Sequence, residues 1–595
     1  MGRCSNGSVW TMALAALVGA ACSRTHVPRA PAAAVSPSVD DAQRVRAVAE
    51  AYAAGFAEAF PDQAEYVGLH VARHDRLPDN SLAALTAFRA REDEWLRSLT
   101  NVNLDALWGK PEWALAGYLE SALSSSVGMR VCRLELWPAH QFGWQTTLLT
   151  ILASQPLGSP NARADALARW RGLPRYLDTE VENLREGLRL GYSVPQHNAK
   201  LAVVQLDALL ASPNASPLGS PLQQDSDDEF RASWQTLLDD AILPAIRRYR
   251  DFLRDEYAPR ARTSLGLDAL PNGAACYRAS LVTYTSSNID PSDLYRRGEA
   301  LIAEREAKGL ELARRLYGPG ITDVRAAKAA MDADPRNRFA STNDAVAFIQ
   351  SAMDRATLAA PRWFERTPRA PLVLAPYDEF QAKTHPGARY EPASADGSRP
   401  ARFRVDVTNF AALTRADAAN TTFHEAIPGH HLQIGLEHEL GNLGPRAVSS
   451  AVASFIEGWA RYAEGLADEM ALYGSDLERL GAILHLPTGL LVDPGIHAFG
   501  WTRERAITWV KQRQVSFNDE QTAAYVDRIA VWPAQMVSYG VGELDIITLR
   551  REAEAALGAR FDVRAFHAEL LRHGAITLPM ARNAVRRWVA LRSKP

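Results

Sequence analysis

F-H-E-A-I-P-G-H-H-L-Q, at residues 423–433, is the stretch around which we expect this chain to fold. It places His424, Glu425, His430 and His431 within eight residues. Neutral imidazole nitrogens and carboxylate oxygens are ligands that zinc takes in proteins, and a carboxylate beside such a site can take a proton from water. The stretch therefore predicts a metal centre, with Glu425 as the general base.

The spacing of the histidines leaves the ligand set open. His430 lies six residues after His424 and His431 lies seven after it, so an unbroken helix would bring His431 nearly back to the face of His424. Pro428 and Gly429 oppose an unbroken helix, because proline removes a backbone donor and glycine tolerates the angles of a bulge. Either histidine can then return to the metal. Histidines that only cap a helix and hydrogen-bond are the alternative to a metal site.

A third ligand is expected from the next helical stretch, residues 455–470, which reads F-I-E-G-W-A-R-Y-A-E-G-L-A-D-E-M. It offers Glu457 and Glu464, two turns apart. Glu457 is preferred because it lies between apolar Ile456 and Trp459, where a carboxylate without a partner would be costly to bury. Glu464 could instead accept a hydrogen bond from a ligand imidazole. Solvated positions on the helix surface remain the alternative for both.

These two stretches resemble the bacterial domain of unknown function family 885, whose signature is H-E-x-x-P-G-H-H-x-Q followed by E-G-W-A-x-Y-A-E. The resemblance runs from about residue 45 to the C-terminus. That family is grouped with zinc peptidases of the H-E-x-x-H plus Glu type, and it is similar in outline to helical metallocarboxypeptidases and oligopeptidases. The resemblance implies a large helical, two-lobed hydrolase with one zinc ion per chain. It also favours His430 as the ligand, with His431 supporting it.

Residues 490–505, L-L-V-D-P-G-I-H-A-F-G-W-T-R-E-R, are similar to the family's block V-V-D-T-G-I-H-x-x-G-W-T-R-E. Thr502 is typical of a residue that caps a helix, which would leave His497 in the loop before it. His497 could polarise a substrate carbonyl or stabilise an oxyanion, and Asp493 could orient a ligand imidazole. A histidine that only caps a helix or bonds a carbonyl is the alternative.

Residues 531–543, V-W-P-A-Q-M-V-S-Y-G-V-G-E, resemble the family's W-P-G-Q-A-x-x-Y-x-x-G-E. We expect Tyr539 to donate a hydrogen bond where charge develops in the reaction. The chain departs from the family at several positions. Gly540 stands where the family usually has a lysine, and Leu486 and Gly489 stand where it usually has arginines. It departs also at Tyr525, Ile529 and Ala534, where the family has an acidic residue, a tyrosine and a glycine. The lost cations could have held a substrate carboxylate, so carboxypeptidase-like specificity is in doubt while the metal site is intact.

At 595 residues the chain is long enough for a large core and two lobes. Its formal net charge of −3 gives no basic excess, which argues against nucleic acid as a partner. Apolar residues recur at helical spacing through most of the sequence. We predict a mainly α fold, with a helical N-terminal lobe over residues 40–369 and a catalytic lobe over residues 370–595.

A small β-sheet is expected beside the metal-site helix. Residues 371–376 and 402–409 alternate with period two and carry β-branched or aromatic side chains, which is typical of strands, whereas residues 387–400 predict a loop. In the peptidases that the family resembles, an edge strand before the metal helix pairs with the extended substrate. Residues 403–409 would do so here by that resemblance. A purely structural sheet is the alternative.

The N-terminus predicts export. Arg3, an apolar run at residues 9–21 and Cys22 are typical of a signal peptide over residues 1–21, followed by a Pro/Ala-rich linker over residues 22–39. The small residues before Cys22 resemble a lipoprotein box, although Gly19 stands where leucine is usual. Lipidation of Cys22 would attach the protein to a membrane, facing the periplasm or the cell surface. Cleavage without lipidation is the alternative.

Two further cysteines, Cys132 and Cys276, could form a disulfide or remain buried thiols. Taken together, the sequence predicts an exported zinc hydrolase that cleaves peptide or related amide bonds, of the carboxypeptidase or oligopeptidase type. The alternative is a catalytically altered, substrate-binding lipoprotein that keeps the metal site. A purely structural surface protein gives no reason for the cluster at His424.

Overall fold

A computed structural model describes residues 39–66, 69–377, 387–394, 397, 399–441 and 450–593. The predicted signal peptide, Cys22 and all but the last residue of the predicted linker lie outside the described residues. Among the helices of the described part, none is long and apolar enough to span a bilayer.

Helices make up most of residues 39–359, as the sequence predicted. They are α1 (Val39–Ala59), α2 (Pro61–Tyr66), α3 (Leu82–Leu99), α4 (Pro111–Met129), α5 (Trp144–Ala153), α6 (Pro160–Arg171), α7 (Leu173–Leu190), α8 (Gln196–Ala211), α9 (Ser220–Gln224), α10 (Asp228–Leu237), α11 (Leu243–Phe252), α12 (Ala258–Arg260), α13 (Gly273–Thr285), α14 (Pro291–Tyr317), α15 (Val324–Ala333) and α16 (Thr342–Ala359). Short π-helical stretches, Leu238–Ile242 and Leu253–Tyr257, adjoin α11 at its two ends.

A small sheet and a second run of helices complete the chain. The strands are β1 (Leu372–Leu374), β2 (Ala388–Glu391) and β3 (Ala401–Val405). The helices are α18 (Arg415–Glu425), α19 (His430–His438), α20 (Ala453–Glu469), α21 (Asp476–Ile483), α22 (Gly489–His497), α23 (Arg503–Lys511), α24 (Asp519–Val531), α25 (Val537–Leu557), α26 (Val563–Leu571) and α27 (Leu578–Arg592). The prediction of a mainly α fold with a small sheet is confirmed.

The sheet differs from the sequence prediction in one important respect. β3 is the central strand, parallel to β1 and antiparallel to β2, so the strand order of the sheet is β1-β3-β2. Both edges of β3 are hydrogen-bonded to neighbours, so the expectation that residues 403–409 form an edge strand for substrate is wrong. The predicted loop at residues 387–400 contains the missed edge strand β2. Its Arg389 and Tyr390 pair with Arg404 and Phe403.

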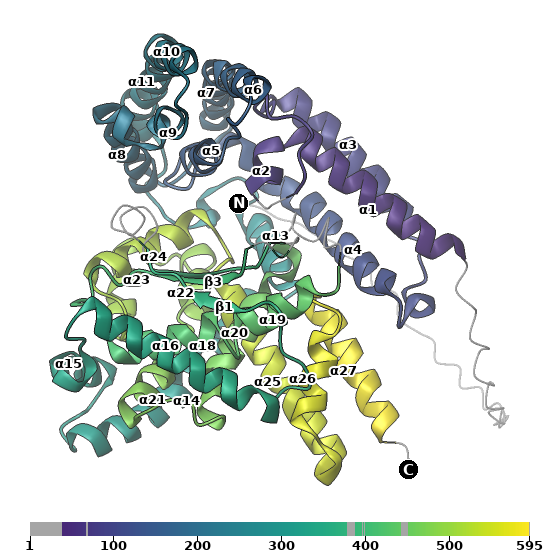
Figure 1. The fold of residues 1–595 in the computed structure, drawn as a ribbon, viewed down its shortest axis with the longest axis vertical. Coiled ribbons are helices and arrows are strands. Elements are labelled where there is room, and N and C mark those ends of the chain that lie inside the picture. The colour runs from purple at the N-terminus through teal and green to yellow at the C-terminus, as the bar shows by residue number, and fades with distance from the viewer. Residues whose placement is uncertain are drawn as a thin grey trace, which may run out of the picture.

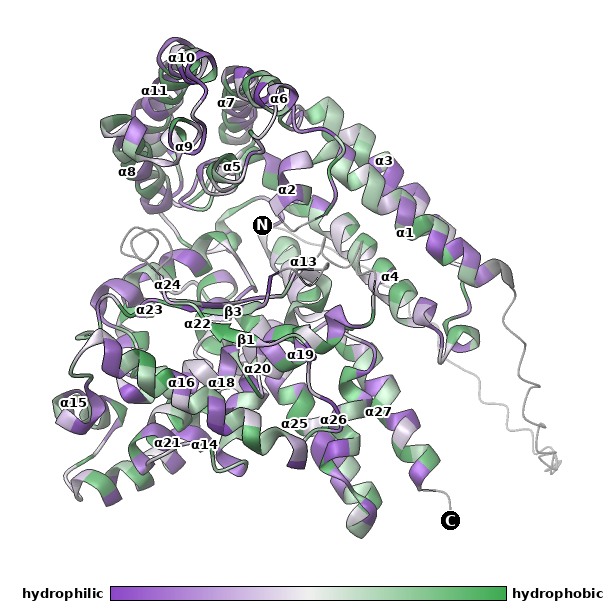
Figure 2. Ribbon diagram, viewed as in Figure 1, coloured by the Kyte–Doolittle hydropathy of each residue, from purple (hydrophilic) through white to green (hydrophobic). Residues whose placement is uncertain are grey.

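Packing joins segments that are far apart in the sequence. In Figure 1, α5 to α11 gather at the top of the view, and the sheet with the helices from α14 onward fills the lower half. One hydrophobic core combines α1 and α4 with α18, α20 and α25–α27. Green and purple residues alternate along exposed helices such as α1 and α3 in Figure 2, as expected for helices with one buried face.

The helices between residues 291 and 359 belong with the second half of the chain. α14 packs against α21 and α22, and α16 packs against α18. The predicted division at residue 370 assigned α14–α16 to the N-terminal lobe, yet the cores run across that point. α16 and the sheet thereby support α18, which carries the histidine motif, from the same side.

A disulfide links two helical regions. Cys132, at the end of a 3₁₀ turn after α4, is bonded to Cys276 in α13, across 144 residues of sequence. Both side chains are buried in the core. The bridge therefore fixes α13 against the end of α4, the helix that also contacts α1 and α3. Of the two alternatives left open by the sequence, the structure has the disulfide.

Candidate metal centre

The histidine motif is divided between two helices. α18 ends at Glu425 and α19 begins at His430, with a turn that includes the cis Ile427–Pro428 bond between them. Pro428 and Gly429 thus end the helix, as their residue types predicted. The motif is not a bulge within one continuous helix, because residues 426–429 between α18 and α19 are not helical. This turn, rather than helical periodicity, decides which histidine faces His424.

Close packing holds the turn in place. A Cβ atom on Gly429 would lie 1.9 Å from the backbone oxygen of His424, so only glycine fits there. The indole Nε1 of Trp459 donates a hydrogen bond of 2.9 Å to the backbone oxygen of Pro428. Trp459 is fully buried on α20, the helix that also carries Glu457. The turn and the third predicted ligand are therefore fixed to one another.

Three predicted ligands meet at one point: His424 from α18, His430 from α19 and Glu457 from α20. Their ligand atoms all lie within 4.8 Å of one another. Glu457 Oε2 lies 3.8 Å from His424 Nε2 and 3.5 Å from His430 Nε2. Zinc bonds of 2.0–2.1 Å give a tetrahedral edge of about 3.3 Å. The donor types and their separations fit a zinc ion held by three protein ligands.

Glu464 supports the first of these ligands. Its Oε1 lies 2.8 Å from His424 Nδ1. Arg461 and Asn420 also donate to the Glu464 carboxylate, at 2.7 and 3.0 Å. Burial acts to raise the pKa of Glu464, but the charge of Arg461 opposes it, and that pKa lies well below its usual range. An ionised Glu464 accepts a hydrogen bond from His424 Nδ1–H, which leaves the lone pair of the ring on Nε2.

His485 completes the support around Glu464. Its Nδ1 receives hydrogen bonds from Arg461 and from Asn420, the latter at 2.9 Å. Nδ1 also lies 2.9 Å from Glu464 Oε2. Burial and the nearby Arg461 charge lower the pKa of His485, so we assign Nδ1 as an acceptor and the ring as neutral. The sequence analysis missed these three residues, although Asn420 lies one turn before His424 and Arg461 lies three residues before Glu464.

His431 lies outside the group formed by the three candidate ligands. Its Nδ1 lies 3.2 Å from the hydroxyl of Tyr390 on β2, and its ring packs on that of Tyr390. Burial lowers the pKa of His431 to about 4, so the ring is neutral. His431 thus connects the motif to the edge strand, and it is not part of the group formed by His424, His430 and Glu457.

Two further predicted residues border this group. Glu425 follows His424 directly and is largely buried, yet no partner for its carboxylate is found among the described residues. Tyr539, near the start of α25, hydrogen-bonds Glu457. Burial acts to raise the pKa of Glu457, but His430, His424 and Tyr539 lower it on balance, so this carboxylate is charged. Burial raises the pKa of Tyr539, which keeps its phenol protonated as a donor.

Comparison with known proteins places the chain in a family. The model of a family described as bacterial proteins of unknown function, DUF885, matches residues 61–585. The chain belongs to the DUF885 family. No curated protein matches it.

Two solved structures are similar to this DUF885 chain in fold. One is a "putative lipoprotein" from Colwellia psychrerythraea, with a TM-score of 0.83, 21% identity, and coverage of 93% of this chain and 99% of the other. The second is a "putative lipoprotein of unknown function" from Shewanella oneidensis, with a TM-score of 0.74 and 17% identity. It covers 91% of this chain and 99% of the other. At these identities the likeness establishes the fold.

His497 of the DUF885 chain is placed differently from the prediction. It is the last residue of α22 rather than part of a loop, although Thr502 does cap α23 as predicted. The backbone N–H of Leu267 donates to its Nδ1 at 3.3 Å, and its Nε2 donates to the backbone oxygen of Ile529 at 2.9 Å. Burial lowers the pKa of His497 to about 3. Both ring nitrogens therefore bond to backbone segments and hold them together. The ring lies outside the group of His424, His430 and Glu457, called the metal group below.

Asp493, predicted to orient a ligand imidazole, also binds elsewhere. Its carboxylate accepts hydrogen bonds from the hydroxyl of Tyr277, at 2.8 Å, and from the backbone N–H of Ala534. Burial raises the pKa of Asp493 to about 7. Ala534 has a φ of 66°, in the left-handed region, at the position where the family usually has glycine. The bond from Asp493 helps hold this turn before α25.

The lost cations of the DUF885 pattern are replaced by apolar packing. A Cβ atom on Gly540 would lie 2.6 Å from Leu490, and one on Gly489 would lie 2.4 Å from the backbone oxygen of Met536. Leu486 is buried in the core. Long basic side chains do not fit at Gly540 or Gly489 without movement of their neighbours.

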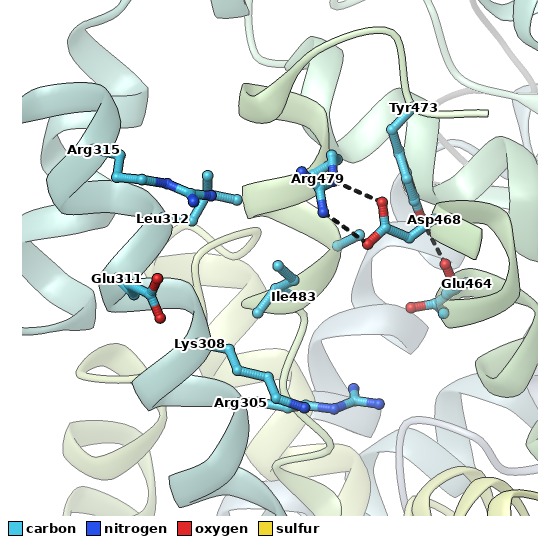
Figure 3. Close-up of a pocket in the computed structure, with 12 residues that line it drawn as sticks. Arg305, Lys308, Glu311, Leu312, Arg315, Glu464, Asp468, Tyr473, Arg479 and Ile483 are labelled. Carbon is cyan, nitrogen blue, oxygen red and sulfur yellow. Dashed lines mark hydrogen bonds and ion pairs between the residues drawn. The ribbon is translucent and has the colours of Figure 1, made fainter. Parts of the chain in front are cut away.

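A charged cavity of about 380 Å³ lies behind Glu464, between α14, α20 and α21 (Figure 3). Arg479 pairs with Asp468 on one wall, and Arg305 and Arg315 extend from α14 on another. Its lining includes none of the three candidate ligands. The cavity thus reaches Glu464, the carboxylate that supports His424.

The tight turn gives a testable prediction. We expect Gly429→Ala to lower bound zinc at least 10-fold, because the added methyl group must displace the His424 backbone from α20. Zinc per chain after dialysis, measured by atomic emission, checks this.

The matched control is Gly465→Ala on α20, where a Cβ atom meets no heavy atom within 4 Å. It should keep full zinc and gain a few tenths of a kcal/mol to about 1 kcal/mol of stability from its higher helix propensity. Full zinc occupancy in Gly429→Ala would contradict the argument.

Proposed function

We propose that this DUF885 protein is an exported, zinc-dependent hydrolase that cleaves peptide or related amide bonds. The observation that carries the proposal is the meeting of His424, His430 and Glu457, with the carboxylate of Glu425, which pairs with none of the described residues, beside them. Two imidazoles and one carboxylate leave a fourth position open, which is the composition of hydrolytic rather than structural zinc sites.

The side chains around the centre suit amide hydrolysis. A bound zinc ion would supply Lewis acidity, which polarises a carbonyl group and lowers the pKa of water. Glu425 accepts the proton of the attacking water and returns it to the departing amine. Tyr539, kept protonated by burial, donates a hydrogen bond where negative charge develops on the carbonyl oxygen. Glu464 keeps His424 in the tautomer with Nε2 free.

An exported location is part of the proposal. The Cys132–Cys276 disulfide is typical of an oxidising compartment, and the predicted signal ends at Cys22. The two similar structures described above carry lipoprotein names, which supports lipidation of Cys22 here as well. The enzyme would then face the periplasm or the cell surface from a membrane anchor.

A substrate-binding lipoprotein that keeps the metal site but no longer turns over substrate is the second candidate. The observation in its favour is the apolar packing at Leu486, Gly489 and Gly540, where the family pattern has cations. Such a protein would bind zinc and peptide without forming products.

Digestion of a mixed synthetic peptide library separates the two candidates. The mature protein should release fragments that intact-mass spectrometry detects. 1,10-Phenanthroline should abolish the products, and added zinc should restore them. A zinc-loaded protein that forms no product from any library peptide would favour the binding protein over the hydrolase.

A further inference from the structure

An apolar cavity of about 280 Å³ lies where α13 meets the turn between α24 and α25. Aromatic side chains form much of its wall, including Trp137, Phe142, Tyr284 and Trp532. Phe142, Trp532 and Leu134 are 38%, 37% and 44% exposed. They are three of the ten large hydrophobic residues that are exposed in the described chain, and they gather around this one opening.

A guanidinium without an acidic partner stands next to this cavity. Arg528 lies over the ring of Trp532, with its Cζ 5.2 Å from the ring centroid. Its Nη2 donates to Gln535 at 2.8 Å, while its Nε is buried and unpaired. Within the described residues no carboxylate pairs with Arg528, whereas its helix neighbour Asp527 is paired with Arg503. A partly buried cation of this kind is favourable when an anion binds to it.

Contacts lead from Arg528 to the metal centre. Gln535, which accepts from Arg528, also hydrogen-bonds Tyr539, and Tyr539 hydrogen-bonds Glu457. At the cavity, the indole Nε1 of Trp532, on which Arg528 is stacked, donates a hydrogen bond to the hydroxyl of Tyr284. Arg528 is thus linked to the cavity through Trp532 and to Tyr539 through Gln535.

We propose that Arg528 and the cavity form a subsite for the C-terminal residue of a peptide. The α-carboxylate binds to Arg528, and a bulky apolar or aromatic side chain fills the cavity. The guanidinium matches a carboxylate in geometry as well as charge. This inference rests on the proposed hydrolase, for which it specifies the substrate class: peptides with a free C-terminus after an apolar residue.

The proposed subsite supplies a cation for the substrate carboxylate in place of those that this sequence lacks. Lysine or arginine at Gly540, Gly489 and Leu486 would have offered charge on the α22 and α25 side, where the chain is now packed with apolar groups. Arg528 on α24 keeps one cation next to Tyr539. Carboxylate recognition therefore does not depend on the missing residues.

Binding of small, non-hydrolysable probes tests the subsite without any turnover. Calorimetry on the full mature protein, with and without chelator, should show that 3-phenylpropionate binds at least 10-fold more tightly than 3-phenylpropionamide. It should also bind roughly 10- to 100-fold more tightly than propionate, the range expected for burial of one aromatic side chain. Equal binding of acid and amide by the wild-type protein would overturn the proposal, as would an acid preference that disappears once metal is removed.

Two variants test separately whether Arg528 binds the carboxylate and whether the cavity binds the aromatic ring of the probe. Arg528→Gln should abolish the preference for acid over amide, while Trp532→Ala should abolish the preference for phenylpropionate over propionate. Arg505→Gln is the matched control, because Arg505 also stacks on a tryptophan, Trp501, with its Cζ 4.5 Å from the ring centroid. It should leave all three affinities unchanged.

Arg528→Lys keeps the charge and should retain part of the preference for acid over amide. If Arg528→Gln does not fold, this variant tests whether residue 528 binds the carboxylate. Retention of the full acid preference in a folded Arg528→Gln protein would overturn the proposal. Acid-selective binding without peptide cleavage would refute the hydrolase and leave the subsite standing. Cleavage that is equally fast for peptides with a free and with an amidated C-terminus would refute the subsite and leave the hydrolase standing.

Discussion

Glu425→Gln should retain zinc and lose hydrolysis by roughly 10²-fold or more, the usual scale for removing a positioned general base. Glutamine keeps the size of the side chain but cannot take up a proton at neutral pH. Glu425 is suited to the base role because it follows His424 at the end of α18, and no described residue engages its carboxylate. The rate of peptide cleavage and the zinc content, measured on the same sample, check the prediction.

Glu437→Gln is a matched control on the next helix. Glu437 is equally buried and accepts a hydrogen bond from Gln433 at 2.9 Å, away from the metal group. Its replacement should leave the cleavage rate within a few-fold of wild type. If Glu425→Gln cleaves peptides at nearly the wild-type rate with zinc in place, Glu425 is not the base and the peptidase mechanism fails.

The second large effect concerns the metal itself. The mature protein should contain close to one zinc ion per chain, and His424→Ala, His430→Ala or Glu457→Ala should each empty the site. Each change removes one of three ligands whose donor atoms converge. Zinc content by mass spectrometry after dialysis, together with a zinc titration, measures the loss.

His431→Ala is the discriminating control. Its ring bonds Tyr390 rather than the metal group, so it should keep zinc while losing the contact to β2. Retained zinc in His430→Ala together with its loss in His431→Ala would reverse the assignment of the two histidines. Full occupancy in Glu457→Ala would require another third ligand, with Glu464 the next carboxylate to consider.

Much of the helical fold could be predicted from local sequence, because caps and apolar spacing act within one element. Thr502 caps α23 where the sequence indicated. The sheet could not be predicted as well, since strand order depends on pairings between distant segments. β2 was hidden in a stretch rich in proline, glycine and serine, and its presence at the edge made β3 central.

The candidate site shows the same limit. Residue types identified the group of histidines and Glu457, but the spacing could not choose between His430 and His431. The turn decides between them through the contact of Gly429 with the His424 backbone and the bond from Trp459 to Pro428. The motif at His497 was similarly ambiguous, because only tertiary structure brings Leu267 and Ile529 against its two nitrogens.

The core shared by the two ends of the chain has a consequence for biosynthesis. α1 and α4 bury their apolar faces partly against α25 and α27, and Gly117 of α4 lies directly against Met580 of α27. A ribosome makes these partners more than 400 residues after α4. The nascent chain therefore carries uncovered apolar helices until α25–α27 have been made, and a polypeptide truncated before α25 leaves apolar surface exposed of the kind that chaperones and proteases bind.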